Sequence, residues 1–189
     1  TEPQTEESKE VFEELEENEN EEQRMSDTLF SENFQSLSVG DTYFGNNFLT
    51  VKQEDSNKYL ETRYVPNEQG TPRIIHRDVV ASTDEATISY KVYFEDGFDF
   101  AKGGKLPGLA SRYPVTGCAD RIAEDGWSVR LMWKRDGILS IYYYDQDRES
   151  GDCGKNTFAN GFNFETGKWY DIEVQMRMND PNQRNGEVR

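Results

Sequence analysis

Two strand-like runs on either side of a short turn constrain the fold of this chain more than any other feature. They make up residues 126–147, which read GWSVRLMWKRDGILSIYYYDQD. Both runs are rich in β-branched and aromatic residues, which favour strands. The Asp136-Gly137 step between them is typical of a chain reversal, because glycine can adopt the positive φ that a tight turn requires. The segment therefore predicts an antiparallel hairpin.

The length of the turn decides which side chains of the hairpin lie opposite one another. A turn of two residues would pair Arg130 with Tyr143, whereas a turn of three, 135–137, would pair Arg130 with Tyr142. In the second case Gly137 would be a left-handed bulge residue. Because successive side chains point to opposite faces, the two registers place different tyrosines beside the arginine.

We predict the three-residue turn, because it separates an apolar face from a polar one. Val129, Leu131 and Trp133 would then be buried together. The opposite face would gather one polar patch of four side chains: Ser128, Arg130, Tyr142 and Tyr144. On spacing alone, an ordinary half-solvated strand pair fits this pattern equally well.

Other strand-length segments recur every 10 to 15 residues, and no helical periodicity follows the N-terminal region. Predicted strands lie in 30–34, 43–51, 58–65, 74–80, 86–94, 158–164, 167–178 and 187–189. Residues 95–125 form the longest stretch without a strand pattern, and its glycines and Pro107 predict a constrained loop that holds Lys102 near Lys105. The paired lysines are equally compatible with a solvated turn. This pattern predicts an all-β antiparallel sandwich.

The acidic charge is concentrated at the N-terminus. Residues 1–27 carry 12 acidic and two basic side chains of a chain whose net charge is −16, so the remainder is only mildly acidic. We expect residues 1–26 to be a disordered tail or linker, with a tether to a membrane anchor as the alternative, and residues 27–189 to be one domain.

Composition also excludes several classes of function. No apolar run is long enough for a membrane span. Nucleic-acid binding is disfavoured because a surface that follows phosphates should be basic. No cofactor is expected. An Asp- and Asn-rich loop can bind structural calcium, but no calcium motif is present.

The chain has two cysteines, Cys118 and Cys153, and both fall in loop-like sequence. We predict a disulfide that ties together the loops flanking the hairpin, with two free thiols as the alternative. Such a bond is typical of exported proteins, so we expect a secreted, periplasmic or cell-surface location.

Four motifs in order resemble the polysaccharide lyases of family 14, which act on alginate and polyglucuronate, and the related family 20 glucuronan lyases. They are KGGKLPG at 102–108, WSVRLMWK at 127–134, YYY at 142–144 and GKWY at 167–170, and the resemblance covers about 85–189. It implies a jelly roll of the concanavalin A type, whose concave sheet binds the substrate. The family has further strands beyond the equivalent of residue 189, so the jelly roll is expected to lack its C-terminal strands.

The resemblance also implies an activity and a set of residues. The activity is β-elimination of a 4-linked polyuronate, an acidic polysaccharide, by a protein that we expect to be a monomer. Lys105 or Arg130 would neutralise the substrate carboxylate, Ser128 would orient it, and Tyr142 and Tyr144 would supply the base and the acid.

Four more residues are secondary candidates for substrate binding. Lys102 lies close to Lys105 in sequence, and Trp127 offers a ring for stacking on sugars. His76 is the only histidine, and with Arg77 it could line the cleft; a hydrogen-bonded surface histidine is equally compatible. The alternatives to a lyase are a non-catalytic carbohydrate-binding module and a structural or adhesive surface domain.

Overall fold

The computed structural model describes residues 28–64, 79, 83–118, 126–149 and 152–189. The chain divides into two compact units, residues 1–81 and 82–189, and each is described by itself. The acidic tail, predicted for 1–26, lies outside the described residues. That the rest of the chain forms one domain stays a prediction.

The first unit contains a small antiparallel sheet in the order β1-β2-β3. Its strands are Thr42–Tyr43, Asn46–Glu54 and Asn57–Thr62. The strand predicted at 30–34 was wrong, because the side chains of Glu32 and Asn33 bond backbone N–H groups two residues ahead and Phe34 has a φ of 61°. Such local bonds favour turns over strands.

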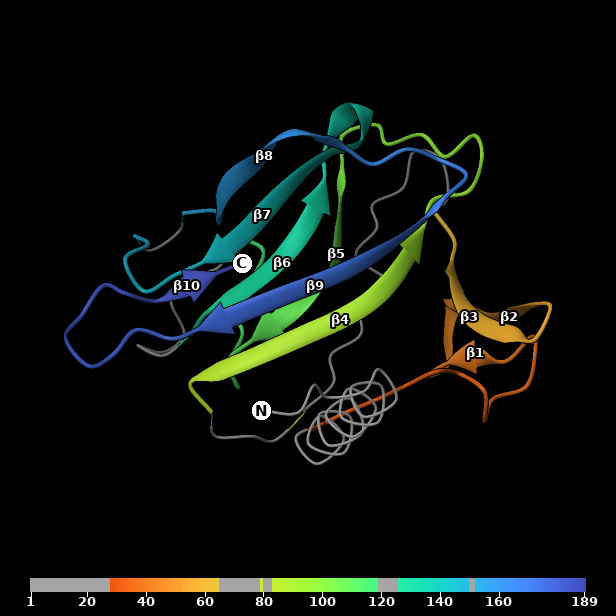
Figure 1. Ribbon diagram of the computed structural model, residues 1–189, viewed down its shortest axis with the longest axis horizontal. Coiled ribbons are helices and arrows are strands. Elements are labelled where there is room, and N and C mark those ends of the chain that lie inside the picture. Colours follow the sequence, from red (N-terminus) through yellow and green to blue (C-terminus); the bar gives the residue numbers. More distant parts are fainter. Residues whose placement is uncertain (1–27, 65–78, 80–82, 119–125, 150–151) are drawn as a thin grey trace, which may run out of the picture. The chain divides into compact units, whose positions relative to one another are not determined.

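The second unit is built from two antiparallel sheets (Figure 1). One has the strand order β10-β9-β4 and the other the order β5-β6-β7-β8. The strands are β4 Glu85–Tyr93, β5 Gly104–Ala110, β6 Ser128–Trp133, β7 Ile138–Tyr144, β8 Lys155–Asn163, β9 Trp169–Arg177 and β10 Glu187–Val188. The described residues contain no α-helix, so the all-β prediction is confirmed; none of them forms a helix long and apolar enough to cross a membrane.

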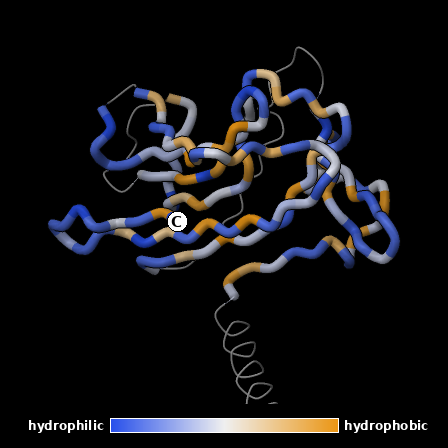
Figure 2. Tube along the Cα trace, turned by 45° about the horizontal axis from the view of Figure 1, so that its top comes forward, coloured by the Kyte–Doolittle hydropathy of each residue, from blue (hydrophilic) through white to orange (hydrophobic). Residues whose placement is uncertain are grey.

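The hydrophobic core of this unit lies between its two sheets. Leu131 and Trp133 of β6 pack in one cluster with Val174 of β9, and with Phe94 and Phe164. Burial alternates along β9, which is the pattern of a strand with one face in a core, and Figure 2 shows apolar and polar segments alternating along the trace. The opposite face of β6 and β7 therefore points away from this core.

The hairpin has the predicted register. Arg130 lies opposite Tyr142, and the turn η2 spans Arg135–Gly137, three residues. Gly137 has a φ of 74°, as expected for a bulge residue, and Asp136 is also left-handed with a φ of 60°. The strand pairing thus confirms the three-residue turn, on which the predicted separation of an apolar from a polar face depends.

The segment that resembles the lyases at 102–108 is largely a strand, so its prediction as a loop was wrong. Lys105 pairs with Met132 and Gly108 with Arg130, with a register shift between them. β5 is an edge strand, where a proline such as Pro107 is tolerated because its missing N–H faces away from the sheet. The irregular register hid the strand pattern.

Candidate functional site

The site is built around two tyrosines on the outer face of β7. Tyr142 and Tyr144 are two residues apart, so their side chains share a face, and their hydroxyl oxygens are 2.9 Å apart. They are 8% and 2% exposed, respectively, and Val115 packs against them. The predicted polar patch is therefore gathered on one face, but it is covered rather than open.

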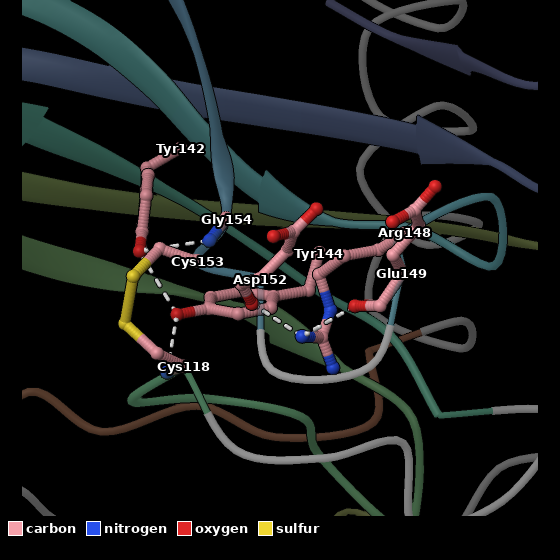
Figure 3. The surroundings of a disulfide bond; sticks show 8 residues. All are labelled: Cys118, Tyr142, Tyr144, Arg148, Glu149, Asp152, Cys153 and Gly154. Atoms are coloured by element: carbon pink, nitrogen blue, oxygen red, sulfur yellow. Dashed lines mark hydrogen bonds between the residues drawn. A yellow bond between two sulfur atoms is a disulfide. The ribbon is translucent and has the colours of Figure 1, made fainter.

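Two backbone N–H groups donate to these hydroxyls from loops on either side of the hairpin. The N–H of Cys118 lies 3.1 Å from Oη of Tyr144, and the N–H of Gly154 lies 3.2 Å from Oη of Tyr142. Figure 3 shows both donors beside the Cys118–Cys153 disulfide. The two phenols therefore form one hydrogen-bonded chain with a donor at each end.

The pKa values of the two tyrosines are moved in opposite directions. Burial, together with the hydrogen bond and charge of Tyr144, raises the pKa of Tyr142. Burial also acts to raise the pKa of Tyr144. The hydrogen bonds from Tyr142 and the backbone, with the charge of Lys105, outweigh it and hold that pKa below its usual value. Tyr144 is thus the member of the pair that ionises more readily, and Tyr142 can donate its proton to the Tyr144 oxygen once that oxygen is ionised.

Arg130 places a guanidinium beside the tyrosines from the neighbouring strand. Burial lowers its pKa, while the charges of Tyr144 and Tyr142 act to raise it. The guanidinium stays cationic, because arginine does not deprotonate in proteins. Its Nη2 donates to Oγ of Ser128 at 2.5 Å, and that hydroxyl donates to the carbonyl of Val115 at 2.7 Å. Ser128, only 2% exposed, uses its single proton on the backbone.

Two lysines flank the ring of Tyr142. The Nζ of Lys105 is 5.3 Å from its centroid, and that of Lys134 is 5.7 Å away. Burial and the charge of Lys105 lower the pKa of Lys134. We had not singled out Lys134 from the sequence, although alternation along the chain places it on the face of Ser128 and Arg130.

The predicted disulfide between Cys118 and Cys153 is present. Beside it, the guanidinium of Arg148 lies 5.2 Å from the ring centroid of Tyr144 and donates to the carbonyls of Glu149 and Asp152. Arg148 is 3% exposed, and no sequence pattern had marked it. It holds the loop that leads to Cys153 against the tyrosine.

The other predicted binding residues lie apart from the pair or outside the described chain. Lys102 is in an exposed turn before β5, and Trp127 precedes β6 on the face of Val129 by strand alternation. Within the described part of the chain, no side-chain bond or ring contact joins either residue to the tyrosines. His76 and Arg77 lie outside the described residues. The described residues hold no group of three acidic, His or Cys side chains suited to a metal ion.

Most of the chain, the site included, matches the model of one enzyme family. The family model of polysaccharide lyase 14 matches residues 52–189, which include every strand of both sheets of the second unit. The chain belongs to polysaccharide lyase family 14. The family's match also covers β3, which lies in the first unit.

Two solved structures of alginate lyases are similar to this member of family 14. The marine PL-14 alginate lyase from Aplysia kurodai is 26% identical, with a TM-score of 0.60 over 76% of this chain and 64% of that one. Alginate lyase vAL-1 from Chlorella virus is also 26% identical, with a TM-score of 0.47 over 53% of this chain and 45% of that one. The chain thus spans less than two thirds of either structure. No curated protein matches it.

Proposed function

We propose that this family 14 chain cleaves a 4-linked polyuronate, alginate or glucuronan, by β-elimination, and that its second unit is part of a jelly roll. The observation that carries the proposal is the pair of bonded hydroxyls of Tyr142 and Tyr144, with Arg130, Lys105 and Lys134 around them. A module that only stacks on sugars has no need of this arrangement. The disulfide supports passage through an oxidising compartment.

β-Elimination begins with a weakly acidic proton. The C5–H bond of the uronate breaks, the C4–C5 double bond forms, and the bond from C4 to the bridging oxygen breaks as that oxygen takes a proton. The C5 proton is removed more easily when a cation stabilises the charge that develops on the adjacent carboxylate. Arg130 and Lys105 supply such cations, and the arginine can contact both carboxylate oxygens.

The two tyrosines would act as one unit in the proton transfer. Tyr142 is the more exposed of the pair and lies next to both lysines, so its oxygen meets the substrate. As Tyr142 takes the C5 proton, it passes its own proton to the phenolate of Tyr144 across the 2.9 Å bond. Tyr142 then gives a proton to the leaving oxygen and regains one from Tyr144, which restores the pair.

From the sequence, Ser128 is predicted to orient the substrate carboxylate, and we propose a different role for it. Its proton goes to the carbonyl of Val115, so its oxygen serves as the acceptor that fixes the guanidinium of Arg130. Lys134, beside the same tyrosine ring as Lys105, is the second cation available to the carboxylates of the polymer. Lys102, His76, Arg77 and Trp127 stay secondary candidates for substrate binding.

The test is a panel of polymannuronate, polyguluronate and glucuronan, assayed by the ultraviolet absorbance of the unsaturated product and, in parallel, for binding. We expect unsaturated product from at least one polymer, and a loss of about 10²- to 10⁴-fold in rate with Tyr142→Phe. Binding without any unsaturated product would support a carbohydrate-binding module instead. Full activity in both the Tyr142→Phe and the Tyr144→Phe proteins would overturn the proposed chemistry.

A further inference from the structure

The Cys118–Cys153 disulfide joins the two loops that supply the backbone donors of the tyrosine pair. Its cysteines are 35 residues apart in the sequence, and the hairpin β6–β7 lies between them. One donor is the N–H of Cys118 itself, and the other belongs to Gly154, directly after Cys153. Both donors are therefore within one residue of the bridge (Figure 3).

The backbone at the first donor is in a conformation that needs support. Cys118 has a φ of 59° and Gly117 a φ of 69°, and both residues are exposed. A left-handed conformation at a residue other than glycine costs free energy and persists only where the surroundings enforce it. The bond to Cys153 is the covalent constraint at this position. Without it, the loop could relax and turn the Cys118 N–H away from Tyr144.

The second donor sits in a place that only glycine fits. A Cβ at Gly154 would lie 2.8 Å from Cζ of Tyr142 and 2.8 Å from Cε2 of Tyr144. The backbone of the loop therefore rests directly against both rings. Its approach from the β7 side is fixed by Arg148, whose guanidinium bonds the carbonyl of Asp152, and from the other side by the bridge.

We propose that the Cys118–Cys153 disulfide is a positioning element of the active site, which holds the backbone N–H groups of Cys118 and Gly154 on the hydroxyls of Tyr144 and Tyr142. Its effect on catalysis rests on the proposed function, whereas its effect on the tyrosines does not. A bridge that only stabilised the fold would leave the ionisation of the tyrosines unchanged once the protein is folded.

Removal of the bridge should change the pKa of Tyr144. Loss of the Cys118 donor removes a hydrogen bond that favours the phenolate, so the pKa of Tyr144 rises. Three of the charged groups that face the pair come from other elements: Arg130 from β6, Lys105 from β5 and Lys134 after β6. The fourth, Arg148, lies in the same loop as Cys153, where it donates to the carbonyls of Glu149 and Asp152. A rise in the pKa of Tyr144 would therefore reflect the loss of the contacts that the bridge holds in place.

The experiment is a titration of tyrosinate absorbance in the full chain, comparing the oxidised protein with the Cys118→Ser/Cys153→Ser protein. Serines are used because free thiols titrate near pH 8.5 and would overlap with the tyrosine signal. A Tyr144→Phe substitution in each background assigns the step. We expect the earliest step of the oxidised protein to belong to Tyr144 and to move up by about one pH unit without the bridge.

A second arm covers the case in which the serine protein does not fold. Dithiothreitol transfers two electrons and two protons to the bridge, which yields two thiols and the cyclic disulfide of the reagent. The chain contains only these two cysteines, so the reagent acts on this bond alone. Both thiols are then alkylated with iodoacetamide, so that no thiol titrates with the tyrosines. With the circular dichroism spectrum retained, we expect the same rise of the Tyr144 step, and a sample reoxidised before alkylation should keep the step of the oxidised protein.

The outcomes separate this inference from the proposed function. An unchanged Tyr144 step in a folded protein without the bridge would overturn the inference, and so would loss of the fold in both arms, because the bridge would then serve stability alone. Activity should fall about tenfold, with the rising limb of its pH profile moved to higher pH. If the Tyr→Phe proteins stay fully active, the proposed function fails while the titration still decides the role of the bridge.

Discussion

At the scale of single residues, the account depends on close contacts around the two phenols. Gly154 gives the clearest test. Its backbone φ is not left-handed, so a substitution there would act by steric overlap with its neighbours and not by backbone strain. We expect Gly154→Ala to push the loop off both rings and to lower kcat about tenfold or more, since a small misplacement of catalytic groups is costly. Steady-state assays on a polyuronate that the wild type cleaves would measure this.

Asp152→Ala is the matched control for Gly154→Ala. The Asp152 side chain is exposed, and the loop uses its backbone: the carbonyl accepts from Arg148 and the N–H donates to the carbonyl of Glu149. We expect this variant to keep the wild-type kcat. Equal losses from the two substitutions would show that the loop tolerates no change at all, which would contradict a specific contact at Gly154.

Ser128 carries a second prediction at this scale. Ser128→Ala leaves the buried carbonyl of Val115 without its donor and removes the acceptor for Arg130. We expect the free energy of unfolding to fall by about 1–3 kcal/mol and kcat to fall with it. Urea denaturation, together with assays at a temperature where both proteins are folded, would check this. A variant as stable and as active as the wild type would contradict the positioning role.

At the scale of elements, the hairpin turn determines the register and therefore the site. Gly137 has a φ of 74°, and a Cβ there would lie 2.1 Å from the carbonyl oxygen of Phe164. We expect Gly137→Ala to lower the free energy of unfolding by roughly 1–3 kcal/mol, with a matching loss of activity. Chemical denaturation would measure the change.

Asp136→Gly is the control for the turn, because Asp136 is also left-handed, with a φ of 60°, and glycine adopts this conformation without strain. It should leave the stability unchanged or raise it. If Gly137→Ala were as stable as the wild type, the three-residue turn would not be what holds Arg130 opposite Tyr142.

The elements also show what the sequence could predict. Alternation and the turn residues were enough to predict the pairing of Arg130 with Tyr142, because register in a hairpin is a local property. They could not predict that Lys105 lies in a strand, since the register shift before Gly108 breaks the alternation. Cys118 and Gly154 lie over the phenols because the tertiary structure brings their two loops together. No local sequence pattern predicts that contact.

At the scale of the whole molecule, the chain is strongly acidic while its candidate site is cationic. The net charge is −16, yet Lys105, Lys134 and Arg130 surround the tyrosines. A polyanion should therefore bind through a local field that salt screens over about 10 Å at 0.1 M ionic strength. We expect KM to rise with ionic strength, and Lys134→Gln to raise KM and to weaken this salt dependence.

Lys91→Gln is the control for charge. Lys91 pairs with Asp171 at 3.2 Å on the sheet that does not carry the tyrosines. Its removal should leave KM and the salt dependence unchanged. If Lys91→Gln and Lys134→Gln weakened binding equally, the substrate would respond to net charge rather than to this site.

The central claim is that the bonded tyrosine pair transfers the proton, with the phenolate on Tyr144. The base must be deprotonated to act, so the rate should rise with pH through the pKa of Tyr144, which lies below the usual value for tyrosine. The most direct measurement is the pH profile of kcat/KM for the wild type and for Tyr144→Phe. We predict a slower variant that has lost the wild-type rising limb, because the Tyr144 oxygen that accepts the proton of Tyr142 is gone. A Tyr144→Phe protein with the wild-type rate and the same limb would contradict the account.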